Sequence, residues 1–532
     1  MKKTQKIIVI GLDGGTWNII KPLVKQGKLP AIEKLIKNGS CGELESSMPP
    51  VTSPAWKCYS TGKNPGKFGV YFWENIDVGK KRFIVNNSTS FKSKEIWDYL
   101  SDYGLVCGIL GMPTTYPPKK VNGFMVSEFN PSNSGYANPN YLEKELSDLF
   151  SYVGEFSDYH GGDKNLIIKD RKKLIKQRFD ASRYLFKKFN PDFCHITIFH
   201  IDNIQHFYWE DMEDKDSKYG KAIEEAWILI DNELKKLLEY FNYNLDDEVN
   251  KKSENIYIIL MSDHGFTKTK SFFNINQWLI KKEYLVLNDT KSSLKVLLYS
   301  KISRSYLAVT TINKLNKIHL IKNILKNIQK KIWGNKLAEG IINWKKSKII
   351  PFPWGLYINK NLIGDKEYEI FRNKVLNELK EIENPDNGNK LAKKIYKKED
   401  IYSGKYISTA PDIIIGLNEG FMMPCQFKEK RLWYLPDEGG WSGTHKLHGI
   451  FCISGPGIKK KREINNAKII DLAPTILHIM NVPIPDDMDG RVLTECFEED
   501  SKLAKRKIVY HYISEKSKIN DKIKSLKISK KL

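Results

Sequence analysis

Side chains that can bind metal ions stand in four separated parts of the chain, most of them directly after an apolar run. Each is a carboxylate or an imidazole. Six such oxygen and nitrogen ligands are the right kind and number for two borderline divalent cations. The six residues are Asp13, Asp202, His206, Asp263, His264 and His445.

The spacing within these segments favours shared ions. Asp202 and His206 are four residues apart, so a helical turn places both on one face. Asp263 and His264 are adjacent and would point to opposite faces of a regular strand. Gly265 follows them, however, and lets the chain turn at the strand end so that both side chains can bind one metal.

Each segment alone also has a purely structural interpretation. An aspartate before glycine, such as Asp13, is often a turn residue or a helix N-cap. An Asp and a His four residues apart are often a surface pair on a helix. The two ionisable residues after the run IYIILM are harder to explain in this way, because buried charges need partners. All of the segments together predict a metal centre.

The segment PPVTSPAWKCYSTG (residues 49–62) carries three prolines and several hydroxyl groups. Pro54 forces Ser53 out of the α region, and the prolines hold the backbone so that Thr52 faces the metals. A hydroxyl at a dimetal site loses its proton near neutral pH and becomes a nucleophile. We therefore expect Thr52 to be the nucleophile, with Ser53 as the alternative. In isolation, the segment could be a proline-rich turn whose hydroxyls cap a helix.

The elements that must position these residues alternate along the chain. Short β-branched runs predict buried strands, and amphipathic segments between them predict helices. This alternation predicts an α/β fold with a mostly parallel central sheet flanked by helices on both faces. Ligands bind at the carboxyl ends of such strands, where the polar residues above stand. The predicted strands are 7–15, 106–115, 193–203, 256–266 and 449–457, and the helices are 17–39, 94–104, 171–189 and 222–241.

Changes in composition divide the chain into four parts. Residues 1–284 and 347–500 are expected to form the two parts of a catalytic core. Between them, residues 285–346 are rich in Lys, Ile, Leu and Asn, which predicts a basic helical insertion or cap. Its apolar face could lie on a membrane or pack on its own protein. Residues 501–532 form a basic C-terminal tail.

The composition is that of a folded globular protein, with 41% hydrophobic and 28% charged residues among 532. A net charge of +23 can attract phosphorylated substrates, anionic lipid or nucleic acid, or can simply keep a lysine-rich surface soluble. Seven cysteines without a C-x-x-C pair argue against a disulfide framework and suit a reducing compartment. The first apolar run is too short for a signal peptide, and no run could span a membrane. We expect a cytoplasmic protein, with peripheral membrane contact through its basic parts as an option.

Taken together, these motifs resemble the type I phosphodiesterase/nucleotide pyrophosphatase family of the alkaline phosphatase superfamily. The resemblance spans most of residues 6–495 and weakens across roughly 285–340 and the tail. It implies an alkaline phosphatase-like fold with a helical cap. The segments that carry it are IIVIGLDGG, TSPAWKCYSTGKNPGKFGV, HIDNIQH, MSDHGF and GTHKLHGIFCISGPGI.

The resemblance also implies roles for single residues. Thr52 would attack phosphorus to give a phosphothreonine, which water then hydrolyses. Both metals are usually zinc in the family, and manganese is the alternative, because the mixed ligand set leaves the choice open. One metal would be held by Asp202, His206 and His445, and the second by Asp13, Asp263, His264 and the Thr52 oxygen.

Two positions depart from the family pattern. Phe68 stands where relatives often have a histidine, which is not among the metal ligands. The asparagine that holds a phosphoryl oxygen in relatives does not align cleanly, and Asn75 is the substitute that this sequence offers. His195, His200 and His448 are expected to be structural.

The sequence therefore predicts a dimetal hydrolase of phosphodiester or pyrophosphate bonds. Its substrate would be a small phosphorylated molecule, either a nucleotide or a lipid-linked phosphate. The same site in a phosphomonoesterase, or in a phosphoryl transferase or mutase, is the second interpretation. The third is a non-catalytic binder of nucleic acid or anionic membrane, which the complete ligand set and Thr52 argue against. A sulfatase is disfavoured because Cys58 is followed by YSTG rather than by the formylglycine signature.

Overall fold

The computed structural model describes residues 5–128, 134–153, 163–243, 255–288, 336–425, 427, 429–436 and 440–512. The predicted insertion over 285–346 therefore falls largely outside the described residues, and so does most of the predicted tail. No helix among the described residues is long and apolar enough to cross a membrane.

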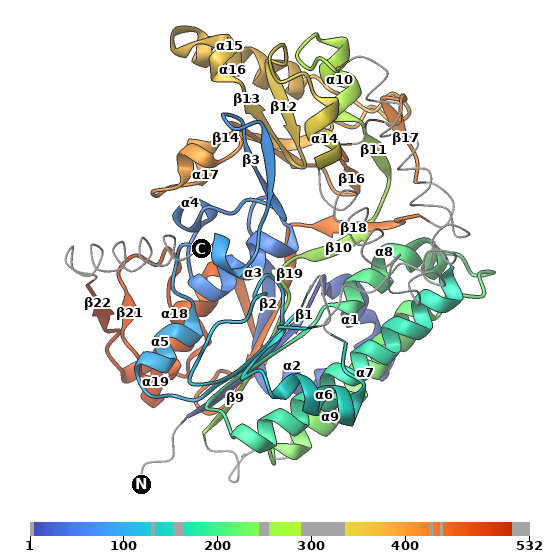
Figure 1. Ribbon diagram of the computed structural model, residues 1–532. Coiled ribbons are helices and arrows are strands. Elements are labelled where there is room, and N and C mark those ends of the chain that lie inside the picture. The colour runs from blue at the N-terminus through green and yellow to red at the C-terminus, as the bar shows by residue number, and fades with distance from the viewer. Residues whose placement is uncertain are drawn as a thin grey trace, which may run out of the picture.

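A nine-stranded sheet forms the centre of the molecule (Figure 1). Its strand order is β20-β2-β19-β9-β1-β8-β5-β6-β7. Only β19 and β7 run against the other strands, so the prediction of a mostly parallel central sheet is confirmed. The strands are β1 Lys6–Leu12, β2 Gly39–Glu45, β5 Cys107–Met112, β6 Gly123–Ser127, β7 Ala137–Asn138, β8 Phe193–Ile198, β9 Ile256–Met261, β19 His448–Ser454 and β20 Arg462–Lys468.

Helices cover both faces of this sheet because its inner strands are apolar on both faces. In β1, Ile8 and Ile10 pack on one face with the long helices, while Ile7 and Val9 pack on the other. All four side chains are fully buried, and each contributes about 1.5–3 kcal/mol of hydrophobic free energy. The first face carries α1 Trp17–Lys25, α2 Pro30–Lys37, α7 Lys164–Phe189 and α9 Ala222–Tyr240, and the second carries α3 Thr52–Thr61, α5 Ile96–Asp102 and α18 Leu472–Ile479.

The predicted helix over 17–39 is two helices. α1 ends before Gly27. The φ of Gly27 is 71°, in the left-handed region that glycine adopts without strain. Pro30 then begins α2, where its missing N–H costs nothing. A glycine and a proline three residues apart therefore end one helix and begin the next.

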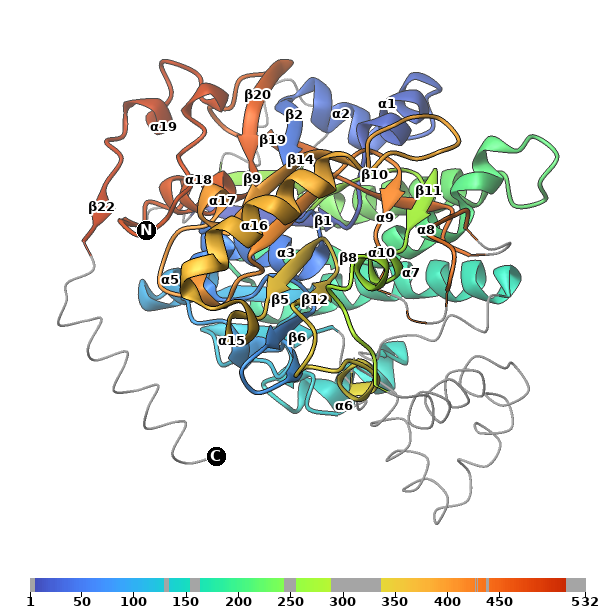
Figure 2. The ribbon, with the colours of Figure 1, turned by 90° about the horizontal axis from the view of Figure 1, so that it is seen from above.

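A second, smaller sheet lies above the carboxyl edge of the central sheet (Figures 1 and 2). We call it the cap sheet, and its strand order is β12-β13-β15-β14. It has its own hydrophobic core, so this part of the predicted second core segment adds no strand to the central sheet. Its elements are β12 Ile349–Phe352, β13 Gly355–Ile358, α16 Asp365–Lys380, β14 Ala392–Lys397 and β15 Ile413–Leu417.

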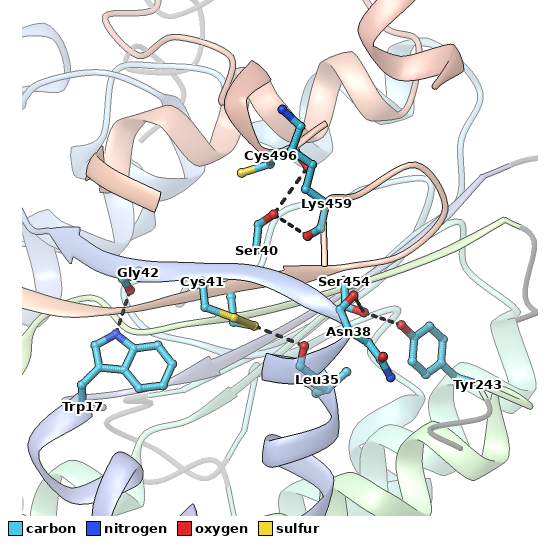
Figure 3. Close-up of a disulfide and its surroundings, with 11 residues drawn as sticks. Trp17, Leu35, Asn38, Ser40, Cys41, Gly42, Tyr243, Ser454, Lys459 and Cys496 are labelled. Atoms are coloured by element: carbon cyan, nitrogen blue, oxygen red, sulfur yellow. Dashed lines mark hydrogen bonds between the residues drawn. A yellow bond between two sulfur atoms is a disulfide. The ribbon is translucent and has the colours of Figure 1, made fainter. Parts of the chain in front are cut away.

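One pair of cysteines differs from the expectation that the chain has no disulfide framework. Cys41 in β2 lies opposite Cys452 in β19, and the two form a disulfide (Figure 3). The other five cysteines are free. The pair is 411 residues apart in sequence, so only the register of the two strands brings the sulfur atoms together.

Candidate active site

The six predicted ligands come together at the carboxyl edge of the central sheet. Asp13 follows β1, and Asp263 and His264 follow β9. The helix α8 (His200–Glu213) follows β8 and carries Asp202 and His206 on its first two turns. His445 lies in β18 (Gly443–Lys446), which pairs with β10 (Gly265–Lys268) just beyond the end of β9. Segments from four parts of the chain therefore share one site below the cap sheet (Figure 1).

One set of side chains gathers around His264, and we call it the Asp13 group. The His264 Nε2 atom lies 3.6 Å from Asp13 Oδ1 and 3.3 Å from Asp263 Oδ2. It also lies 3.4 Å from the hydroxyl oxygen of Thr52. The two carboxylates and the imidazole are fully buried. This group is the set expected to bind the second metal.

The other set gathers around Asp202, and we call it the Asp202 group. The Nε2 atoms of His206 and His445 lie 3.1 Å apart. They lie 3.4 and 3.3 Å from the two carboxylate oxygens of Asp202. The ligand atoms of Asp202, His264 and His445 lie within 4.8 Å of one another, so the two groups adjoin. This arrangement suits two neighbouring ions, which dimetal sites hold about 4 Å apart.

Both groups have the spacing of metal ligands. Bonds of 2.0–2.1 Å to a tetrahedral ion place two ligand atoms about 3.3 Å apart. The distances within the groups, 3.1–3.6 Å, match that value. In addition, Asp13 Oδ1, Asp202 Oδ1 and Asp263 Oδ2 are buried without a hydrogen-bond donor. Buried carboxylate oxygens without donors indicate that a cation belongs there.

Each of the three histidines is oriented by a carbonyl behind it. The Nδ1–H of His206 donates to the Gly443 carbonyl at 2.7 Å, and that of His264 donates to Gly265 at 3.1 Å. The Nδ1–H of His445 donates to the carbonyl of Pro50 at 3.0 Å. The Nε2 lone pairs therefore face the site, as metal-binding histidines require.

Two donors hold the carboxylates of the Asp13 group. The Trp56 indole donates to Asp13 Oδ2 at 2.8 Å, and the Gly14 backbone N–H donates to Asp263 Oδ1 at 3.2 Å. In each case the opposite oxygen is left facing the site. Trp56 fits only because residue 11 is glycine, since a Cβ there would lie 2.3 Å from a carbon of the indole ring. Gly11 in IIVIGLDGG thus makes room for the ring that orients Asp13.

The pKa values of these groups are shifted by their burial and by one another. Burial and the nearby carboxylates raise the pKa of Asp13 well above its usual value, and they raise the pKa of Asp263 to about 7. Burial lowers the pKa of His206 to about 4 and lowers the pKa of His264 well below its usual value. No lysine or arginine in the described chain pairs with Asp13, Asp202 or Asp263. Neutral imidazoles beside unpaired carboxylates are the form that binds divalent cations.

Thr52 occupies the start of α3, directly beside the Asp13 group. It is the first helical residue and is buried. Ser53 is helical too, so the expectation that Pro54 keeps Ser53 out of the α region is wrong; Pro54 stands in the first turn of α3, where a helix tolerates proline. The hydroxyl of the neighbouring Ser53 donates to the Phe72 carbonyl at 3.3 Å. Of the two candidate nucleophiles, only Thr52 therefore has its hydroxyl oxygen beside a predicted metal ligand.

Asn75 is not brought into this cluster. Its amide nitrogen donates to the Gly69 carbonyl at 2.6 Å. Its amide oxygen accepts from the Tyr71 backbone N–H and from the Asn86 side chain. The amide of Asn75 therefore holds the loop that follows α4 (Pro65–Phe68) together.

The three histidines expected to be structural also lie outside the two groups. His195 contacts the hydroxyls of Tyr59 and Thr197 in the core. His200 is buried on α8, and His448 begins β19, partly exposed. Phe68 is buried in the core.

Two tryptophans of the site were not predicted from the sequence. They are Trp56, described above, and Trp441, whose ring stacks on His206 with centroids 4.0 Å apart. Trp56 lies one helical turn after Thr52, and that spacing is the only signal for it in the sequence. Trp441 stands four residues before His445 in a glycine-rich loop, where no periodicity indicates a role.

Comparison with protein families identifies the chain. A model of the type I phosphodiesterase/nucleotide pyrophosphatase family matches residues 7–449, which include both metal-binding groups and Thr52. The chain belongs to this family. The predicted family is therefore confirmed, and so is its implication of a hydrolase of the phosphodiesterase/pyrophosphatase type. A search of curated protein sequences finds no match.

Solved structures with the same fold are distant in sequence. The phosphonoacetate hydrolase of Sinorhizobium meliloti 1021, solved with phosphonoformate, is 12% identical, with 90% of this chain and 96% of that chain covered and a TM-score of 0.54. An inactive form of murine ectonucleotide pyrophosphatase/phosphodiesterase 5 in complex with AMP is 15% identical, with 90% and 95% covered and a TM-score of 0.47. At such identities the likeness concerns the fold alone.

Proposed function

We propose that the protein hydrolyses phosphodiester or pyrophosphate bonds with two divalent metal ions and a phosphothreonine intermediate on Thr52. The observation that carries the proposal is the position of the Thr52 hydroxyl oxygen, 3.4 Å from His264 Nε2 at the edge of the Asp13 group. A nucleophile and a set of unpaired metal ligands converge there on one buried point.

The two groups of ligands would hold one ion each. When bound, the ions would acidify the attacking hydroxyl and neutralise charge on the phosphoryl oxygens. The Thr52 oxygen attacks phosphorus, and the bond to the leaving-group oxygen breaks on the opposite side. Water then attacks the same phosphorus from that opposite side, which releases the remaining half of the substrate as a phosphomonoester and restores the Thr52 hydroxyl. Trp56 and Gly14 keep the carboxylates of Asp13 and Asp263 aimed at the ions throughout.

The first turn of α3 supports the same chemistry. Backbone N–H groups at the start of a helix have no partner within the helix and attract anions. The attacking oxygen is therefore placed where a phosphoryl group is favoured.

For the substrate we propose a small phosphorylated molecule, either a nucleotide or a lipid-linked phosphate. The family name supports the first of these. We propose zinc for both sites, with manganese as the alternative, because imidazole suits zinc while carboxylate oxygens also accept manganese.

The test is turnover of bis(4-nitrophenyl) phosphate and 4-nitrophenyl phosphate with zinc or manganese. Thr52→Ala should lower kcat at least about a thousandfold, because a missing nucleophile removes the whole covalent route. Thr52→Ser should retain part of the activity, and Ser53→Ala should behave like the wild type. Mass spectrometry of acid-quenched wild-type enzyme should find phosphate on the peptide with Thr52.

Two outcomes would contradict the proposal. Equal turnover by Thr52→Ala and the wild type would remove Thr52 as the nucleophile. A wild type that is inert towards both esters with either metal would contradict the hydrolase. Faster turnover of the monoester than of the diester would favour the phosphomonoesterase, and transfer of phosphate to an added alcohol would favour the transferase.

A further inference from the structure

The last described residues form an exposed surface of basic and aromatic side chains. We call Lys502, Lys505, Lys507, Val509, Tyr510 and Tyr512 the C-terminal basic surface. They lie on α19 (Lys502–Lys505), on β22 (Tyr510–His511) and between and just after them. Tyr510 is 51% exposed and Tyr512 is 78% exposed.

This surface is fixed to the body of the protein. Leu503 is buried in the core, and the Arg506 guanidinium donates to the carbonyls of His478 and Ile479 at the end of α18. β22 pairs with β21 (Ile484–Pro485). The lysines and tyrosines therefore point outward from an anchored backbone.

The charge of the surface is of one sign. No acidic residue occurs between Lys502 and Tyr512, and residues 502–532 contain eleven basic and two acidic residues. Lys505 pairs with the fully exposed Asp500 at 3.1 Å. Within the part of the chain that the structure describes, Lys502 and Lys507 have no acidic partner within ion-pair distance. Two of the three lysines of the surface therefore have no acidic partner, although the exposed Glu498, Glu499 and Asp500 closely precede Lys502.

We propose that the C-terminal basic surface binds the surface of an anionic lipid bilayer. Tyrosines prefer the level of the lipid headgroups, and lysines beside them are attracted by anionic lipids. Charge complementarity argues against a second copy of the chain as the partner, because a symmetric contact would bring lysines against lysines.

The surface lies apart from the proposed active site. In Figures 1 and 2, β22 and α19 lie at one flank of the molecule, while α8, β10 and β18 lie at the other side of α3. Attachment through this flank would leave the carboxyl edge of the central sheet uncovered. The inference does not depend on the proposed function.

The experiment is co-sedimentation of the full-length protein with vesicles of phosphatidylcholine alone or mixed with phosphatidylglycerol. The wild type should bind only the anionic vesicles and should dissociate as sodium chloride is raised. The triple variant Lys502→Glu, Lys505→Glu, Lys507→Glu should bind about a hundredfold more weakly or worse, since each lysine near an anionic surface adds to binding. Tyr510→Ser with Tyr512→Ser should bind several-fold more weakly.

A matched triple variant on α16, Lys366→Glu, Lys374→Glu, Lys380→Glu, changes the net charge equally at another exposed site. It should bind anionic vesicles nearly as the wild type does. Equal weakening by both triple variants, or equal binding to neutral and anionic vesicles, would overturn the proposal. The proposal would also be overturned if double-stranded DNA bound with the same dependence on Lys502, Lys505 and Lys507. It would be overturned as well if the protein formed dimers that Tyr510→Ser abolishes. Circular dichroism checks that every variant is folded.

Discussion

The two groups of predicted metal ligands differ in charge, enclosure and support. The Asp13 group has two carboxylates, one imidazole and the Thr52 hydroxyl, and its carboxylates and imidazole are fully buried. The Asp202 group has one carboxylate and two imidazoles, and the His445 side chain is 14% exposed. The first group is more anionic and more enclosed, and it holds the proposed nucleophile. The second is the more open half of the site.

Their supports differ in the same way. The Asp13 group rests on the end of β1 and on α3, through the hydrogen bond from Trp56. The Asp202 group depends on α8 and on the pairing of β10 with β18, which lie far apart in sequence. The half of the site that holds the proposed nucleophile is therefore built into the core of the protein, whereas the other half is assembled at the edge of that core.

Removal of the metals gives the largest expected effect. Dialysis against a chelator should abolish diester hydrolysis, while circular dichroism should show most of the helicity retained, because the core is large enough to fold alone. The ion of the Asp202 group should leave first, since the exposed edge of His445 gives the chelator access. Global unfolding on chelation, or simultaneous loss of both ions, would contradict the difference between the groups.

Substitution of a single carboxylate ligand should have the next largest effect. Asp263→Asn should lower kcat at least about a thousandfold, because it removes one of the two negative charges beside the nucleophile. Asp202→Asn should reduce the metal content by one ion per chain and leave the other ion in place. Asp231→Asn is the matched control, since this buried carboxylate accepts from the N–H groups of Ala31 and Ile32 far from the site. It should lower stability and leave the metal content unchanged.

A buried ion pair between Lys57 of α3 and Glu95 helps to fix α3, which carries Thr52 and Trp56. Breaking this pair tests whether the Asp13 group depends on the position of α3. Glu95 lies 2.6 Å from Lys57 of α3 and 2.7 Å from Lys119. Although burial opposes ionisation, the two lysines lower the pKa of Glu95 to about 2. Glu95→Gln should lower the free energy of unfolding by about 3–5 kcal/mol near neutral pH, because it leaves buried lysine charge unpaired.

This loss should depend on pH with a definite sign. Because the folded-state pKa of Glu95 is depressed, its contribution is present above the usual value of 4.5 and is lost as the pH falls from there towards about 2. Urea unfolding of the wild type and of Glu95→Gln should therefore converge in acid. Glu233→Gln is a matched control with two cationic partners, Arg183 and Lys236, on helices far from α3. It should lower stability but leave the metal affinity unchanged, whereas Glu95→Gln should weaken both.

Much of the site could be predicted because its residues follow apolar runs. Asp13 and Asp263 stand at strand ends, and parallel strands end at one edge of a sheet. The four-residue spacing of Asp202 and His206 needs only one helix. His445 is a candidate by residue type, but its assignment to the metal of Asp202 and His206 comes only from the family resemblance, since its position depends on a strand pair that closes over a long separation.

Other features depend on contacts that no local pattern contains. The cap sheet arises from strands of four to six residues, too short for their periodicity to separate them from loops. Cys41 and Cys452 become neighbours only through the register of two strands. Asn75 is only a substitute for the family asparagine, which does not align cleanly, and the geometry of its loop turns its amide toward Gly69 and Tyr71.

The smallest effect is expected from the tryptophan behind Asp13. Trp56→Phe keeps most of the ring volume but removes the N–H that donates to Asp13 Oδ2. Loss of such a supporting hydrogen bond typically weakens metal binding about 10- to 100-fold. Trp97→Phe is the matched control, because Trp97 is equally buried and its indole nitrogen has no hydrogen-bond acceptor. Titration of the metal-free proteins with zinc should show one weakened site in Trp56→Phe and two unchanged sites in Trp97→Phe. If both variants bound both ions like the wild type, the orientation of Asp13 would not depend on Trp56. The firmer retention of an ion expected of the Asp13 group would then come from its burial and charge alone.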